Sequence, residues 1–227
     1  MTKKIVKKRK IKVFNLLLVL LIPAALSFVI YFSLQIPIQG IVLKNTNYLN
    51  DDDILELAGI KDYPSFFLTS GKEIENKLKK SPYIYKVKLL KKLNFTYVLN
   101  IRENRPLFLD TNQNKYVFDT KETVKEENVS FRVPRLLNYI PDNKNDKFID
   151  SMKIVEESVL SKISDIEYQP NDYDKDRFLL YMDDGNMVYL TLTKFKMINH
   201  YNDVLSQLEN HKGILYLDNG NHFQIKE

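Results

Sequence analysis

Cysteine is absent from this 227-residue chain, and glycine is scarce, with six residues in all. Without cysteine, neither disulfide bonds nor thiol chemistry can contribute to the fold or to a reaction. No glycines form a G-x-G-x-x-G or G-K-[ST] pattern, so no phosphate-binding loop is predicted. The three histidines lie outside any metal-binding spacing. We therefore expect no cofactor and no metal, and the sequence offers little support for redox or nucleotide-dependent enzymes.

Charged residues are absent from one long segment, the 31 residues from Val13 to Leu43. Its first two thirds are apolar enough to cross a bilayer, because about 20 residues at about 1.5 Å each match a hydrocarbon core roughly 30 Å thick. A buried helix of a soluble protein would rarely run so far without one charged face. We predict a transmembrane helix over residues 13–35 and contacts with membrane lipid through residues 1–35.

The residues that flank this segment predict its orientation. The first twelve residues hold seven of the 34 basic residues and no acidic residue. Positive flanks stay in the cytoplasm, so the tail (residues 1–12) should be cytoplasmic and the bulk of the chain extracytoplasmic, a single-pass type II arrangement. A cleaved signal peptide is the alternative, but its small-residue triplet, Ala25-Leu26-Ser27, lies inside the apolar run. Beyond the tail, acidic residues slightly outnumber basic ones, and no nucleic-acid partner is expected.

Residues 36–106 show the pattern of a small α+β domain. A short strand is expected at residues 41–43, a helix after the Asn50 cap, and a second helix after the S-x-x-E capping box that starts at Ser70. Two amphipathic strands joined by a hairpin follow. The buried face of the first of these strands is predicted to carry Tyr85, Val87 and Leu89. The predicted order is strand, helix, helix, strand, strand.

Residues 107–227 are predicted to form a second, β-rich domain. Turn signals after Asp110 and at residues 183–186 indicate two hairpins. An apolar helical stripe runs from Phe148 to Val159, and another helix face starts at Phe195. The last strands of the chain are expected at a sheet edge, where one row of N–H and C=O groups stays unpaired.

Two sites of chemistry remain as alternatives. The run Asp172-Tyr173-Asp174-Lys175-Asp176 begins like a calcium loop, but arginine and aspartate stand where glycine and glutamate are needed, so a solvated loop is favoured. A membrane-anchored Ser/Lys peptidase would need a serine beside a buried, neutral lysine. The best pairs that the chain offers are Ser65 or Ser70 with Lys86 or Lys88. Because those lysines alternate with apolar residues along a strand, they are expected to face solvent.

Several segments, in this order, resemble the FtsQ/DivIB family of bacterial cell-division proteins. Residues 42–54 are similar to the first strand of the family, its N-x-Y-L-S turn and its first helix. Residues 82–87 are similar to the P-x-V-x-x-A-x-V approach to the hairpin, and residues 101–107 to the V-x-E-R-x-P-V-A exit. Near the end of the chain, residues 213–218 resemble I-x-Y-V-D-L-R. The hairpin turn at Lys92-Leu93-Asn94 departs from the pattern, because the family usually has a proline there.

This resemblance implies the fold class and the domains. The class is α+β, with a single N-terminal transmembrane helix, a POTRA-like βααββ domain over residues 36–106, and a C-terminal αβ domain with an antiparallel sheet over residues 107–227. It also implies a non-catalytic, membrane-anchored scaffold of the divisome, located at the division septum, with no small-molecule substrate. Its partners would be DivIC/FtsB-like and FtsL-like division proteins.

The resemblance further implies where a partner binds. In the family, the last strands and the preceding helix receive a strand from a partner by edge addition. The partner-binding residues implied here are Tyr216, Leu217, Asp218, His222, Phe223, Gln224, Ile225, Lys196 and His200. Besides the peptidase, the remaining alternative is a generic adhesion or transport module built on the POTRA fold.

Overall fold

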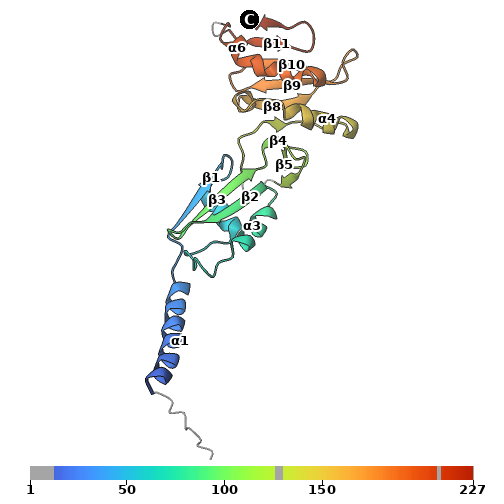
Figure 1. Ribbon diagram of the computed structural model, residues 1–227. Coiled ribbons are helices and arrows are strands. Elements are labelled where there is room, and N and C mark those ends of the chain that lie inside the picture. The colour runs from blue at the N-terminus through green and yellow to red at the C-terminus, as the bar shows by residue number, and fades with distance from the viewer. Residues whose placement is uncertain (1–12, 126–129, 209–210, 227) are drawn as a thin grey trace, which may run out of the picture. The chain divides into compact units, whose positions relative to one another are not determined.

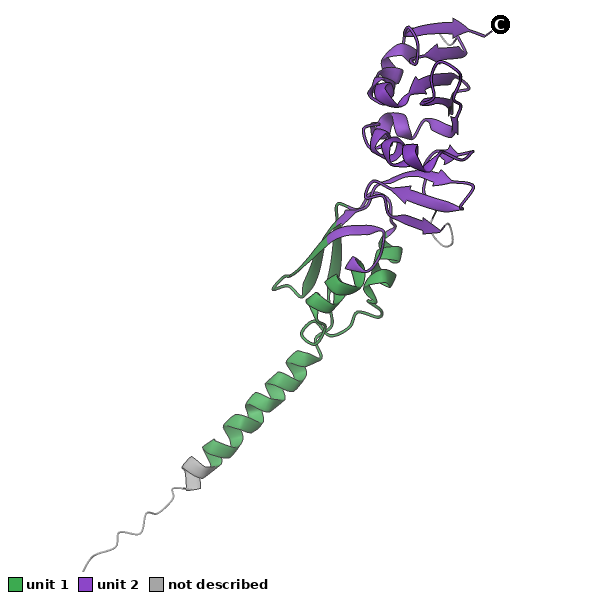
Figure 2. Ribbon diagram, turned by 90° about the vertical axis from the view of Figure 1, so that its right-hand side faces the viewer, with its two compact units in different colours: residues 1–45, 51–78, 87–101 green, residues 46–50, 79–86, 102–227 purple. Residues whose placement is uncertain are grey.

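The structure is a computed structural model that describes residues 13–125, 130–208 and 211–226. The predicted basic tail, residues 1–12, lies outside the described residues. The chain divides into two compact units (Figure 2). The first unit comprises residues 1–45, 51–78 and 87–101, and the second comprises residues 46–50, 79–86 and 102–227.

The predicted apolar helix is confirmed as α1 (Val13–Leu34) (Figure 1). Within it, the residues from Leu17 to Leu34 carry no charge, and none of this stretch is buried in the protein. By length and composition this helix can cross a membrane. Pro23 lies inside the helix, a position that transmembrane helices tolerate.

The βααββ order predicted for the region after α1 is confirmed. Its elements are β1 (Gly40–Lys44), α2 (Asp51–Ala58), α3 (Gly71–Lys79), β2 (Ile84–Lys91) and β3 (Thr96–Glu103). The three strands form a sheet in the order β1-β3-β2, with β1 parallel to β3. Ile54 of α2, Leu78 of α3, and Tyr97 and Leu99 of β3 are fully buried. Three aspartates begin α2 and complement the positive end of its dipole, and Gly59 ends it with φ +67°.

One predicted strand face is wrong at Tyr85, whose ring is 57% exposed. Ile84 takes the buried position together with Val87, and the Arg102 guanidinium lies over the Tyr85 ring at 4.8 Å. The strand starts directly from a turn in which the Ile84 N–H bonds to the Ser81 carbonyl. Strict alternation therefore begins only after the first residues of β2.

A carboxylate closes the loop that precedes α2. The side chain of Glu103, at the end of β3, is 9% exposed. It accepts hydrogen bonds from three successive backbone N–H groups, those of Asn47 at 2.7 Å, Tyr48 at 2.9 Å and Leu49 at 3.0 Å. The carboxylate thus satisfies three backbone donors of the loop that would otherwise be left without a partner on burial.

A nine-stranded sheet runs through the second unit in the order β12-β11-β10-β9-β8-β7-β4-β5-β6. Its strands are β4 (Pro106–Asp110), β5 (Lys115–Phe118), β6 (Thr123–Lys125), β7 (Arg135–Leu136), β8 (Ile163–Tyr168), β9 (Arg177–Met182), β10 (Met187–Thr191), β11 (Gly213–Tyr216) and β12 (His222–Ile225). The pairs β4–β7, β7–β8 and β10–β11 are parallel, and the other five pairs are antiparallel. The expected antiparallel arrangement thus holds for the hairpins, whereas strands joined by long connections pair in parallel.

Helices cover one face of this sheet (Figure 2). They are α4 (Asp142–Met152), α5 (Glu157–Leu160), the 3₁₀ helix η1 (Leu192–His200) and α6 (Tyr201–Leu205). The predicted stripe from Phe148 to Val159 is buried, although the helix is divided into α4 and α5. The core centres on aromatic rings, since Phe148 stacks on Phe178 at 4.7 Å and Phe195 meets both rings edge-on.

Candidate partner-binding edge

Strand β12 forms one edge of the nine-stranded sheet. It pairs antiparallel with β11, which places His222 opposite Tyr216 and Ile225 opposite Gly213. In the part of the chain that the structure describes, no strand pairs with the outer side of β12. The prediction that the last strand lies at a sheet edge is confirmed.

The register of this pair decides which backbone groups face the open side. The N–H of Lys226 donates to the carbonyl of the opposite residue, Lys212, at 2.8 Å. In an antiparallel ladder, hydrogen-bonded and non-hydrogen-bonded residue pairs alternate. By this alternation, the strand residues that bond to β11 are Gln224 and His222. The N–H and C=O groups of Phe223 and Ile225 therefore point away from β11, toward the open edge.

The side chains of β12 divide between core and solvent. Phe223 is half-buried and packs against the hydrophobic core. His222 and Gln224 are exposed, and Ile225 is 54% exposed. On the neighbouring segment, Leu217, another predicted site residue, is buried and packs inside the protein. The open edge therefore combines outward backbone groups with one exposed aliphatic side chain.

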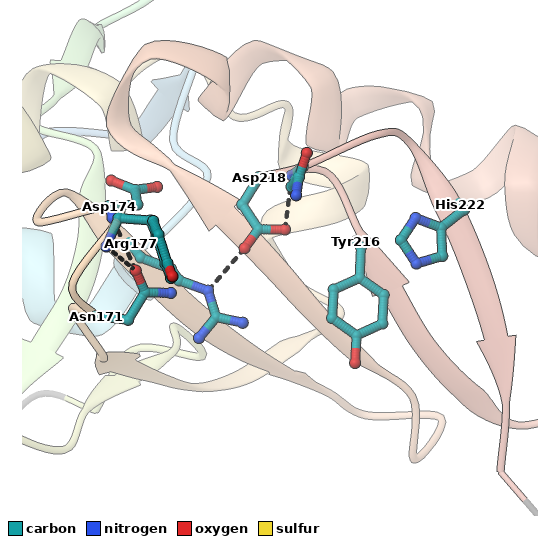
Figure 3. A pocket seen from close by; sticks show the side chains of 8 residues that line it. Asn171, Asp174, Arg177, Tyr216, Asp218 and His222 are labelled. Atoms are coloured by element: carbon teal, nitrogen blue, oxygen red, sulfur yellow. Dashed lines mark hydrogen bonds and ion pairs between the residues drawn. The ribbon is translucent and has the colours of Figure 1, made fainter.

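A row of stacked side chains crosses the last four strands and ends at His222. The Arg177 guanidinium of β9 lies 3.5 Å from the ring centre of Tyr189 of β10. Tyr189 stacks on Tyr216 of β11 at 5.4 Å, and Tyr216 stacks on His222 of β12 at 4.7 Å with an interplanar angle of 10°. Figure 3 shows Tyr216 and His222 side by side. Cross-strand pairs of this kind stabilise a sheet, so the row helps to hold β12 in place.

A cavity of about 580 Å³ borders this row. It is lined by Asn171, Tyr173, Asp174, Arg177, Tyr216, Asp218, Asn219 and His222. Across it, the Arg177 Nε donates to Asp218 Oδ2 at 2.7 Å (Figure 3), and the two side chains are 14% and 9% exposed. The Lys194 Nζ donates to the Asp218 carbonyl at 3.0 Å. Asp218, a predicted partner-binding residue, thus has its carboxylate engaged by Arg177.

Neither Arg177 nor Tyr189 is among the site residues predicted from the sequence. The hairpin signal at residues 183–186 predicts a strand that includes Arg177, but the ion-pair partner of Arg177 follows 41 residues later, and no local pattern links the two. Lys196 and His200, both predicted site residues, lie exposed on η1. Because the main neighbours of η1 are α4, α6 and β10, the structure does not group these two residues with β12.

A buried polar chain anchors the start of β11. The Gly213 N–H donates to Asn186 Oδ1 at 2.9 Å, and Asn186 Nδ2 donates to the Tyr201 hydroxyl at 3.0 Å. That hydroxyl donates in turn to Asp184 Oδ2 at 2.8 Å. Burial, followed by the hydrogen bond to Asp184, raises the pKa of the Tyr201 hydroxyl well above its ordinary value of 10.0. The chain connects α6 and the β9–β10 hairpin to the edge.

Gly213 itself sits where no side chain fits. A methyl group on its α-carbon would lie 2.0 Å from the Gln224 carbonyl oxygen and 2.8 Å from the Phe223 ring. Contacts this short require one of the two strands to move. Glycine at this position therefore allows β12 to approach β11 closely.

The residues proposed for peptidase chemistry are engaged elsewhere. The Ser65 hydroxyl donates to the Leu34 carbonyl at 2.5 Å, and the Ser70 hydroxyl accepts the Glu73 N–H at 3.3 Å. Lys86 and Lys88 are exposed, whereas a Ser/Lys peptidase requires a buried, neutral lysine.

The loop with the D-x-D-x-D pattern bonds to its own backbone. Asp174 Oδ1 accepts the Asp176 N–H at 2.8 Å, and Asn171 Oδ1 accepts the N–H groups of Tyr173 and Asp174. Among the described residues, no group of three or more histidines and acidic residues is placed to hold a metal ion. The geometry describes an Asx-stabilised turn.

Comparison with known proteins places the chain among bacterial relatives. Residues 36–104 match the family described as "POTRA domain, FtsQ-type". The chain is 25% identical over 203 residues to the cell division protein DivIB of Geobacillus kaustophilus, covering 86% of this chain and 78% of that protein. It is 26% identical over 231 residues to DivIB of Bacillus subtilis, covering 97% and 88%. A solved structure, the major extracytoplasmic domain of the trans isomer of DivIB from Geobacillus stearothermophilus, matches with a TM-score of 0.40 and 21% identity, covering 48% of this chain and 96% of that chain.

Proposed function

Because this chain belongs to the FtsQ/DivIB family of bacterial cell-division proteins and carries an FtsQ-type POTRA domain, we propose that it is a non-catalytic scaffold of the divisome. The observation that carries this proposal is similarity to DivIB proteins along nearly the whole chain. The domains of the scaffold would be a POTRA domain over residues 36–106 and a β-rich domain over residues 107–227. In this proposal the protein binds other division proteins and transforms no substrate.

The proposed binding surface is the outer side of β12. A strand of a DivIC/FtsB-like protein would add to the sheet by bonding to the N–H and C=O groups of Phe223 and Ile225. Each such hydrogen bond contributes roughly 0.5–1.5 kcal/mol net, so several bonds and apolar contact with Ile225 together would give a stable complex. The partner would in turn engage an FtsL-like protein. In this arrangement the stacked side chains of Arg177, Tyr189 and Tyr216, on the neighbouring strands, help to hold β12 in place.

The proposed role of α1 is to concentrate the scaffold where its partners are. Among the described residues, one helix, α1, is long and apolar enough to cross a membrane, which fits a single-pass membrane protein. In the proposed type II orientation the basic tail is cytoplasmic and both units lie outside. Confinement to the membrane surface raises the effective concentration of partners that are anchored in the same membrane.

Localisation and co-purification test this function together. A fluorescent fusion of the full-length chain is expected at the division septum, and the solubilised chain should co-purify with the DivIC/FtsB-like protein. A chain ending before Gly213 lacks β11 and β12, and we expect it to lose that partner. Uniform distribution around the cell, together with no division protein in the purified complex, would contradict the proposal and favour a transport or adhesion module.

A further inference from the structure

We propose that the first unit docks onto the lipid surface next to α1 through a docking patch of four exposed side chains, Tyr63, Phe67, Leu68 and Leu93. The proposal rests on α1 spanning the membrane, as in the proposed function. It adds a second membrane contact, made by the folded unit itself. The occupant of the patch is the boundary between lipid headgroups and acyl chains.

Hydrogen bonds place the docking patch beside the end of α1. On one side, the Ser65 hydroxyl donates to the Leu34 carbonyl at 2.5 Å, and the Phe66 N–H donates to the Ile36 carbonyl at 2.9 Å. On the other, the Gln39 N–H donates to the Phe95 carbonyl at the hairpin tip, at 2.9 Å. The loop and the hairpin tip that carry the patch are thus both tied to the residues that leave the helix. Six residue steps lead from Leu34 to Gly40 and reach at most about 21 Å, so the patch stays near the membrane.

These four apolar residues are more exposed to solvent than is usual for apolar side chains. The exposed fractions are 60% for Tyr63, 49% for Phe67, 68% for Leu68 and 100% for Leu93. Scattered exposed apolar residues are ordinary on a protein surface, but a group of them at one place marks an interaction site. Tyrosine, phenylalanine and leucine are also the residues that insert at a membrane interface.

The loop is held rigidly enough to present these residues outward. Phe66, between them, is 7% exposed, and its carbonyl accepts both the Tyr97 hydroxyl at 2.7 Å and the Lys91 Nζ at 2.9 Å. Asp62 and Tyr63 have φ values of +53° and +47°, which residues other than glycine adopt only when the surrounding structure imposes them. The conformation that exposes Tyr63 is therefore built into the fold.

Charged groups around the docking patch fit a headgroup layer. Lys61 and Lys92 are exposed next to it, and Asp62 is the exposed acidic residue of the same loop. Two ammonium groups against one carboxylate favour contact with lipid phosphates. The same apolar side chains would also suit a protein partner. We favour lipid because α1, which adjoins the docking patch, lies in the bilayer in the proposed function.

The absence of cysteine allows a direct test with single-cysteine variants of the full-length chain. Leu93→Cys and Lys44→Cys are labelled with an environment-sensitive fluorophore and reconstituted into vesicles of equal parts phosphatidylcholine and phosphatidylglycerol. Lys44 is the matched control because it is exposed at the end of β1 away from Gly40, the residue next to the connector. We expect a blue shift of the Leu93→Cys probe, and a loss of its emission when lipids with a shallow spin label are included. The Lys44→Cys probe should change in neither respect.

A second variant and a flotation assay separate the possible failures. Adding Leu68→Glu to the Leu93→Cys chain should reduce the blue shift and the quenching while the chain still floats with the vesicles. If the chain floats but the Leu93→Cys probe behaves like the Lys44→Cys probe, the docking patch does not bind lipid. If the chain does not float at all, the anchor fails and the docking proposal fails with it. Shielding of the probe only after other membrane proteins are added would assign the patch to a protein partner and overturn the proposal.

Discussion

The carboxylate of Glu103 accepts a hydrogen bond from the backbone N–H of Leu49 at 3.0 Å, across 54 positions of the chain. The same carboxylate accepts the N–H groups of Asn47 and Tyr48. The N-x-Y-L turn and the V-x-E-R segment, which separately resemble the family, are therefore two halves of one arrangement. The acid closes the turn that leads into α2 and fixes the end of β3 against it.

Replacing Glu103 by glutamine should destabilise the protein by about 2 kcal/mol, because an amide offers one acceptor oxygen where the carboxylate offers two, and buried N–H groups lose their partner. The measurement is the urea dependence of tyrosine fluorescence for the solubilised chain. Glu56→Gln, at an exposed position of α2, is the matched control and should change the free energy of unfolding by less than about 0.5 kcal/mol. Equal stabilities for both variants would contradict the role given to Glu103.

Replacing Ile225 by proline should weaken partner binding by at least about tenfold, equivalent to roughly 1.4 kcal/mol. Proline removes an N–H that points to the open edge, and the ladder between β12 and β11 keeps its own bonds. Ile225→Val is the matched control because it retains both the donor and an apolar side chain. The measurement is the dissociation constant of the solubilised chain for the DivIC/FtsB-like partner. Undiminished affinity of the proline variant would move the interface away from this edge.

Removing the buried member of an ion pair should cost far more than removing an exposed one. Arg177→Ala leaves the Asp218 carboxylate, 9% exposed, without its partner, and we expect a loss of about 3 kcal/mol. Arg135→Ala breaks the pair with Asp165 at the same distance of 2.7 Å, but its side chain is 59% exposed, and the expected loss is at most about 1 kcal/mol. Thermal unfolding of both variants measures the difference. A smaller loss for Arg177→Ala than for Arg135→Ala would refute this ranking.

The raised pKa of Tyr201 predicts a loss of stability at alkaline pH. As the pH rises above 10.0, the ordinary value, the unfolded chain releases the phenolic proton while the folded chain retains it. The unfolded state then binds fewer protons, so the free energy of unfolding falls with increasing pH. Below that pH the stabilising contribution is fully present.

Tyr201→Phe tests this sign. The variant should lose about 1–2 kcal/mol at neutral pH, because Asn186 and Asp184 lose a hydrogen-bond partner, and its stability should fall less steeply above pH 10.0 than that of the parent. Urea unfolding at several pH values measures both effects. Tyr173→Phe, at a fully exposed ring, is the control for the loss of one phenol. Parallel pH profiles for parent and Tyr201→Phe chains would show that another group controls alkaline unfolding.

Local patterns in the sequence predicted the helices and strands of this fold better than they predicted how the strands pair. The βααββ order could be predicted because Asn50, Ser70 and Gly59 mark helix ends by local chemistry. The edge position of β12 could be predicted as well, since a strand that comes late in the chain has few strands left to cover it. In contrast, the parallel pairing of β10 with β11 depends on a crossover through η1 and α6, which periodicity does not specify.

The candidate site shows the same division between local and distant information. Turn signals, which are local, predicted the last strands, and the family resemblance then implied which of their residues bind a partner. Arg177 could not be predicted in this way, because its role depends on Asp218 and on Tyr189, which belong to other strands. Leu217 is a site residue that the family resemblance implies, but its side chain is buried, and its N–H donates to the Tyr189 carbonyl.

The bare α-carbon of Gly213 has a consequence for how mutations in this protein should be interpreted. Any residue with a β-carbon would clash with the Gln224 carbonyl oxygen and displace β12 relative to β11. In the proposed function, such a substitution weakens partner binding although no residue of the open edge is replaced. A genetic screen for lost partner binding is therefore expected to recover substitutions of Gly213 as well as substitutions at the open edge itself.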